Sequence, residues 1–140
     1  MSHSGSSIQL RRLLWVGPLA VIASIVGVLV VRIVAVALLQ PQPMPMSLMW
    51  LTPVIFTAVL VTGAVLVFAL VARFAPNPIR TYQVIAFVVL LLSLVPDVAY
   101  AGSSMPGASW PVAISLMIMH VVAWAICVAI LSRLSVLQDK

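Results

Sequence analysis

Four long runs of apolar residues, separated by short polar breaks, dominate the pattern of this 140-residue chain. A helix needs about 20 residues to cross the roughly 30 Å hydrocarbon layer of a bilayer, and each run is at least that long. Helices can span this layer because they pair all of their own backbone polar groups. The pattern therefore predicts four membrane-spanning helices, at residues 13–39, 48–72, 81–101 and 110–131.

The breaks between the runs are short, and short connections place successive helices side by side and antiparallel. We therefore expect an all-α fold, an integral membrane four-helix bundle of up-down-up-down topology over residues 13–133. Pro76 and Pro78 end one helix and delay the next. Residues 1–12, which are rich in serine, are expected to form a disordered tail, and residues 134–140 a second tail.

Positive charge lies almost entirely on one side of the predicted spans. Two arginines precede the first run, two lie between the second and third, and Arg133 and Lys140 follow the fourth. The other two loops contain no Lys or Arg. Because positive residues near span ends are retained in the cytoplasm, we expect both termini and the central loop to be cytoplasmic. The expected location is the inner or plasma membrane of a bacterial-type cell.

Composition narrows the class of protein further. Hydrophobic residues make up 64% of the chain and charged residues 6%, whereas an ordinary soluble domain has about 25% charged residues. The net charge of +5 is spread over short loops, which indicates contact with lipid headgroups and not with nucleic acid. A single cysteine, Cys127, excludes an intramolecular disulfide.

Three ionisable residues lie inside the predicted spans, where a charge costs at least about 2.5–3.5 kcal/mol near the helix centre. At 1.5 Å per residue from the cytoplasmic end, Arg32, Asp97 and His120 are about 28, 26 and 20 Å deep. Thr57 reaches the same layer at about 24 Å, and Ser93 lies one turn below Asp97. The similar depths and opposite charges of Arg32 and Asp97 predict an ion pair. Alternatively, Arg32 extends to the headgroups and Asp97 ends a helix.

His120 is the ionisable residue closest to the middle of the membrane. Hydrocarbon satisfies neither of its ring nitrogens, so we expect it to contact Thr57, Ser93 or Asp97 on another helix. Imidazole can also relay protons or bind a metal or haem. A haem held by two histidines of one chain is excluded, because His3 lies in the cytoplasmic tail.

Two groups of neighbouring residues are weaker candidates for a ligand or a metal. The helical face of His120 also carries Met117, Trp124 and Cys127. Such a face more often packs in a core than walls an apolar cofactor. Thioethers favour Cu(I), and three of them precede or begin the second run: Met44, Met46 and Met49. Because methionine also fills loop–helix junctions, we expect no metal and no cofactor.

Enzyme signatures are absent from the sequence, which has no glycine-rich phosphate loop, G-x-S-x-G or H-E-x-x-H motif. The acidic residues are Asp97 and Asp139 alone, so we expect a protein that is not an enzyme. The favoured hypothesis is a bundle that associates with itself or with a larger membrane partner. The alternative is a proton-linked carrier or small-ligand site that uses Arg32, Asp97 and His120.

Three short motifs add a family resemblance. They are RRLLWVGPLA at residues 11–20, LSLVPD at 92–97 and LMIMHVVA at 116–123. With them the chain resembles a family of small bacterial four-span membrane proteins described only as a domain of unknown function. The resemblance extends over nearly the whole chain. It implies four spans and no particular activity.

Overall fold

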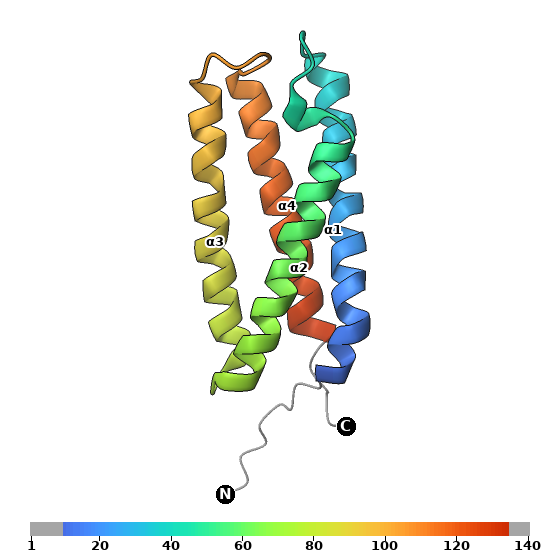
Figure 1. Cartoon of the computed structure of the whole chain (residues 1–140), viewed down its shortest axis with the longest axis vertical. Helices are drawn as coiled ribbons and strands as arrows, with labels where there is room; N and C mark the ends of the chain where they lie inside the picture. The colour runs from blue at the N-terminus through green and yellow to red at the C-terminus, as the bar shows by residue number, and fades with distance from the viewer. Residues whose placement is uncertain (1–9, 135–140) are drawn as a thin grey trace, which may run out of the picture.

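The computed structural model describes residues 10–134, which form four long α-helices and one short 3-10 helix (Figure 1). The elements are α1 (Leu10–Leu39), η1 (Met46–Leu48), α2 (Leu51–Phe74), α3 (Pro78–Ala101) and α4 (Trp110–Leu134). Each α-helix is long and apolar enough to cross a membrane. The protein is therefore an all-α, multi-pass membrane protein with four candidate spans, as its apolar runs predict.

The helix ends differ from the predicted ones for local reasons. α1 begins at Leu10, so the last three residues of the predicted N-terminal tail are helical. α2 begins at Leu51 and not at residue 48, which places Pro53 in its first turn, where the missing N–H costs no hydrogen bond. α3 begins with Pro78 for the same reason. The remaining parts of the two predicted tails, residues 1–9 and 135–140, lie outside the described residues.

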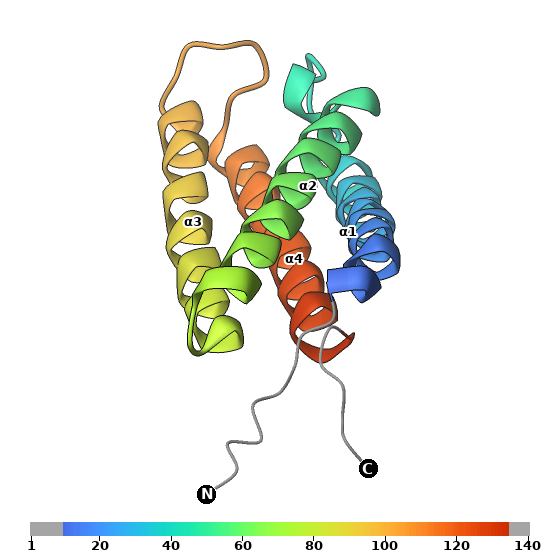
Figure 2. The same cartoon turned by 60° about the horizontal axis from the view of Figure 1, so that its bottom comes forward.

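The four helices run up, down, up and down. Figures 1 and 2 show the start of α1, the α2–α3 turn and the end of α4 at one end of the bundle, here called the terminal end. The opposite loop end carries the α1–α2 connection and the α3–α4 connection (Figure 1). α1 makes its most extensive contacts with α4 and then with α2, and α3 packs mainly on α4. The contact between α2 and α3 is sparser.

Small residues bring α1 close to α4. Ala20 and Ser24 are fully buried, and Ser24 Oγ donates to the Ala123 carbonyl oxygen at 3.5 Å. A Cβ added at Gly27 would come within 2.5 Å of Ile126 Cδ1 on α4. Lipid tails are as apolar as the helices themselves, so association depends on close packing and not on hydrophobic burial. These positions let the two backbones approach each other.

The two connections at the loop end pack against each other. α1 ends where Gln40 takes a left-handed conformation (φ 40°) and its N–H bonds the Val36 carbonyl at 3.0 Å. Gly107 in the α3–α4 connection also has a positive φ, 76°. A Cβ on Gly107 would lie 2.7 Å from the Pro43 carbonyl oxygen and 3.0 Å from Pro45 Cβ. Glycine at residue 107 therefore permits both the turn and the contact between the loops.

Candidate functional site

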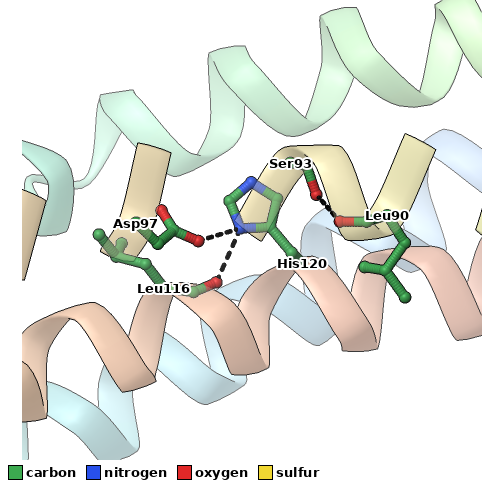
Figure 3. Close-up of polar contacts among 5 residues, drawn as sticks. All are labelled: Leu90, Ser93, Asp97, Leu116 and His120. Atoms are coloured by element: carbon green, nitrogen blue, oxygen red, sulfur yellow. Dashed lines mark hydrogen bonds and ion pairs between the residues drawn. The ribbon is translucent and has the colours of Figure 1, made fainter. Parts of the chain in front are cut away.

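His120 on α4 and Asp97 on α3 meet between the two helices (Figure 3). Nδ1 of His120 lies 2.9 Å from Oδ2 of Asp97 and 3.0 Å from the carbonyl oxygen of Leu116, one helical turn earlier. A carbonyl oxygen only accepts, so the Leu116 contact requires the proton on Nδ1. The contact between His120 and another helix that the sequence predicts is confirmed, and its partner is Asp97.

The contact between His120 Nδ1 and Asp97 Oδ2 is a close electrostatic contact and not an aligned hydrogen bond. The Nδ1–H is directed to the Leu116 carbonyl, and the enclosed Oδ2 receives no aligned hydrogen bond from the residues that the structure describes. Asp97 is 6% exposed, whereas the side chain of His120 is 30% exposed. A protonated imidazole would therefore have a buried carboxylate as its close counter-charge.

The other predicted members of the polar layer do not join this pair. Ser93 Oγ donates to the Leu90 carbonyl on its own helix at 2.7 Å (Figure 3). Thr57 is buried in α2 and makes no polar contact with His120 or Asp97 within residues 10–134. The layer is therefore a two-residue contact between α3 and α4.

The predicted ion pair between Arg32 and Asp97 is wrong, because Arg32 has other partners. Its Nε donates to the Leu48 carbonyl oxygen at 2.7 Å, and its guanidinium carbon lies 3.6 Å from the centre of the Trp50 ring. Within residues 10–134 the one ion pair is that of Asp97 with His120. Depth along a helix does not specify the direction in which a side chain leaves it, and Arg32 faces the α1–α2 connection. It does not extend freely to the headgroups either, because it is 5% exposed.

A cavity of about 250 Å³, partly open to the surroundings of the bundle, lies between α2, α3 and α4 and has His120 in its wall. Most of the wall is apolar: Leu60, Val61, Gly63, Ala64, Val67, Ile85, Ala86, Val89, Leu90, Ala123 and Val128. The side chains with polar atoms are Ser93, Tyr82, Cys127, Trp124 and His120. The cavity coincides with the sparse contact between α2 and α3.

Most polar atoms of the wall are already paired or enclosed. Tyr82 Oη and Cys127 Sγ lie 3.6 Å apart and share one hydrogen bond, and Ser93 Oγ donates to the Leu90 carbonyl. Trp124 Nε1 is enclosed by protein atoms and has no partner within the described residues. Nε2 of His120 differs from Trp124 Nε1, because protein atoms do not fully enclose it. Figure 3 shows this nitrogen directed away from Asp97 and Leu116.

Sequence reasoning identified part of the cavity wall but not the cavity. Its signal was the helical face of His120, and three residues of that face line the cavity: His120, Trp124 and Cys127. Met117, the fourth residue of the face, is not in the wall. Tyr82 was missed, and so were Leu48 and Trp50 as partners of Arg32.

The thioethers considered for copper lie at the loop end. Met44, Met46 and Met49 are all exposed, before, within and after η1 respectively. Residues 10–134 contain no group of three or more His, Cys, Asp or Glu side chains placed to hold a metal ion. His3 lies outside the described residues.

Comparisons with known proteins place the chain in a family without assigning it a role. Neither the curated proteins nor the solved structures contain a significant match. A family model does match, over residues 5–136, which includes both the His120–Asp97 pair and the cavity beside it. The chain therefore belongs to the family of unknown function DUF6069.

Proposed function

We propose that this protein binds a small, mainly apolar molecule within the membrane, in the cavity between α2, α3 and α4. The observation that supports this proposal is His120 in a mainly apolar wall, with a ring nitrogen, Nε2, that protein atoms do not enclose. Ligand sites commonly combine an apolar wall with a few polar groups that orient the ligand. The volume of about 250 Å³ is just below the ~300–1,000 Å³ of sites for drug-sized ligands, so the ligand is small.

In this proposal the imidazole binds in its neutral form, which specifies the polar group of the ligand. With the proton on Nδ1 and directed to Leu116, Nε2 of a neutral ring is a hydrogen-bond acceptor. The matching ligand carries one donor, such as a hydroxyl group, on a compact apolar body. Asp97 keeps the ring in this orientation through its contact at Nδ1. His120 is the binding residue in this proposal, and Asp97 is a positioning residue.

A pair of fluorinated probes tests the proposal in detergent micelles. 4-(Trifluoromethyl)phenol carries the donor, and trifluoromethylbenzene has nearly the same body without it. Fluorine NMR titrations of both probes, corrected for empty micelles, measure their affinities. One net hydrogen bond is worth about 0.5–1.5 kcal/mol, so the phenol should bind roughly two- to tenfold more tightly. His120→Phe should remove this preference and leave binding of trifluoromethylbenzene within about twofold.

A cavity-filling variant provides the matched control for location. Gly63 lines the cavity, and a Cβ there meets no atom within 4 Å, so Gly63→Leu adds a large side chain to the wall with room for its Cβ. It should weaken binding of both probes. Thr62→Leu, on the exposed neighbouring residue, should weaken neither. Equal affinity of wild-type protein and Gly63→Leu for both probes would place binding elsewhere and contradict the proposal.

We also propose the inner or plasma membrane as the location, with the terminal end of the bundle in the cytoplasm. Five arginines support this orientation, because they all belong to the terminal end: Arg11, Arg12, Arg73, Arg80 and Arg133. The two connections of the loop end contain no Lys or Arg. Retention of positive residues in the cytoplasm then orients the chain.

Association with itself or with a larger membrane partner, which the sequence favours, stays a prediction. So do the absence of enzymatic activity and the proton-linked form of the carrier hypothesis.

A further inference from the structure

Arg32 is a buried cation without an acidic partner in the part of the chain that the structure describes. It is 5% exposed, and the one acidic side chain of residues 10–134, Asp97, contacts His120 instead. The connections of the loop end contain no charged residue. A charge that is removed from water requires compensation, and one carbonyl bond with one aromatic contact leaves the net charge in place.

The geometry of the guanidinium leaves one edge available. Nε is bound to the Leu48 carbonyl at 2.7 Å, and the Trp50 ring lies 3.6 Å from the guanidinium carbon. The two terminal nitrogens, Nη1 and Nη2, make no hydrogen bond within the described residues, and protein atoms do not fully enclose them. The small exposed fraction of Arg32 therefore includes the end of its guanidinium. Two parallel N–H groups at that end match two oxygens of a phosphate.

The level of Arg32 in the membrane indicates where such an oxyanion comes from. α1 has 30 residues, about 45 Å, which exceeds the ~30 Å hydrocarbon layer by roughly 15 Å. Arg32 lies seven residues before the end of α1, about 10 Å along the axis. Trp50 and Trp110 are exposed at the same end, as tryptophans at a membrane–water interface are. Arg32 thus lies near the level of lipid phosphates.

We propose that Arg32 forms an anion site at the loop end of the bundle and that this site binds the phosphate group of a phospholipid. Leu48 and Trp50 fix the guanidinium, and its terminal N–H groups hold the phosphate oxygens. The site differs from an arginine that extends into the headgroups, because its side chain is already immobilised within the protein. It is independent of the cavity beside His120.

Native mass spectrometry of the detergent-purified protein tests this site. The probes are phosphatidylglycerol, a monogalactosyl diacylglycerol with the same acyl chains, and inorganic phosphate. Wild-type protein should retain phosphatidylglycerol at least fivefold better than the galactolipid, which lacks a phosphate. Arg32→Gln should remove this preference. Arg32→Lys, which keeps the charge and loses the planar donor pair, should give an intermediate value. Arg80→Gln, on an exposed arginine of the terminal end, should change the preference less than twofold.

Each outcome decides the proposal. Equal retention of the two lipids by wild-type protein, or an unchanged preference in folded Arg32→Gln, overturns it. An Arg32-dependent phosphate adduct without preference for phosphatidylglycerol assigns the site to free phosphate and overturns the lipid assignment. If Arg32→Gln does not fold by circular dichroism, the wild-type comparison and Arg32→Lys still decide. None of these results depends on the probes of the cavity.

Discussion

Nδ1 of His120 and Oδ2 of Asp97 lie 2.9 Å apart and connect the middle of α4 to α3. No aligned hydrogen bond from residues 10–134 reaches that carboxylate oxygen. The contact lies directly beside the apolar cavity, whose wall includes the imidazole but not the carboxylate. Asp97 therefore does not contact a molecule in the cavity directly and acts on it only through its effect on His120.

This relationship predicts energetic coupling between the two residues. In a double-mutant cycle of His120→Phe and Asp97→Asn, the losses in free energy of unfolding should be non-additive by about 0.5–3 kcal/mol. Because His120 is partly exposed, we expect the lower half of that range. Reversible unfolding by SDS in mixed micelles measures the cycle. The control is Arg32→Gln with Asp97→Asn, which should be additive within about 0.5 kcal/mol. Additivity in the first cycle, or strong coupling in the second, would contradict the observed pairing.

The close approach of α1 and α4 predicts a cost for enlarging Gly27. A Cβ there would lie 2.5 Å from Ile126 Cδ1 and 3.0 Å from Val122 Cγ1, so in Gly27→Val either these side chains rearrange or the helices separate. Overpacking of this kind costs about 1–3 kcal/mol of unfolding free energy. Gly63→Val is the matched control on α2, where the added Cβ meets nothing within 4 Å. Equal stabilities of the two variants in SDS unfolding would contradict the packing of α1 against α4.

The contact between the two connections at the loop end predicts a similar contrast. Gly107→Ala introduces a Cβ at φ 76°, 2.7 Å from a backbone oxygen that cannot rotate away. Strained backbone of this kind costs about 1–3 kcal/mol. Gly102→Ala is the control, since its φ is −91° and its added Cβ meets nothing within 4 Å. Limited proteolysis of the α3–α4 connection should accelerate in Gly107→Ala alone. If both variants resist cleavage as the wild type does, the loops do not constrain each other.

The distribution of arginines predicts which end of the bundle is outside the cell. Gln42→Cys and Ser104→Cys, at exposed positions of the loop end, should react with an impermeant maleimide added to intact cells. Asn77→Cys, exposed in the α2–α3 turn, should react only after the membrane is permeabilised. Labelling of Asn77→Cys in intact cells, with the other two variants unreactive, would reverse the orientation.

The architecture could be predicted from the sequence because lipid leaves few solutions for long apolar runs. The start of α2 could not, because it depends on where Pro53 can be placed within a helix. That His120 contacts a polar group on another helix followed from depth and from the need of imidazole for a partner, but the choice of Asp97 over Thr57 and Ser93 did not. The same reasoning failed for Arg32, since its partners are a backbone carbonyl and an aromatic face. A comparison of side-chain charges cannot identify a backbone carbonyl, such as that of Leu48 in η1, as the partner of an arginine.

The cavity had no sequence signal of its own. At its terminal end Tyr82 bonds Cys127 and packs edge-on against Phe68, with ring centres 4.9 Å apart, which joins α2, α3 and α4. Beyond this contact the wall includes the small residues Gly63, Ala64 and Ala86. Their size is visible in the sequence. That they line one cavity from two helices, α2 and α3, is set by the crossing of those helices, which residue spacing along one helix does not define.

Among residues 10–134 the most extensive helix contact joins the first helix, α1, to the last, α4, and this has a consequence for biogenesis. Helices enter the membrane in the order of translation, so the face of α1 that carries Ala20, Ser24 and Gly27 must wait for α4. During that interval lipid occupies the place of Val122, Ala123 and Ile126, and Ser24 Oγ lacks the Ala123 carbonyl that accepts its hydrogen bond. The bundle therefore cannot close before α4 has been made, and a chain truncated after α3 presents an unfinished helix face to the proteases of the membrane.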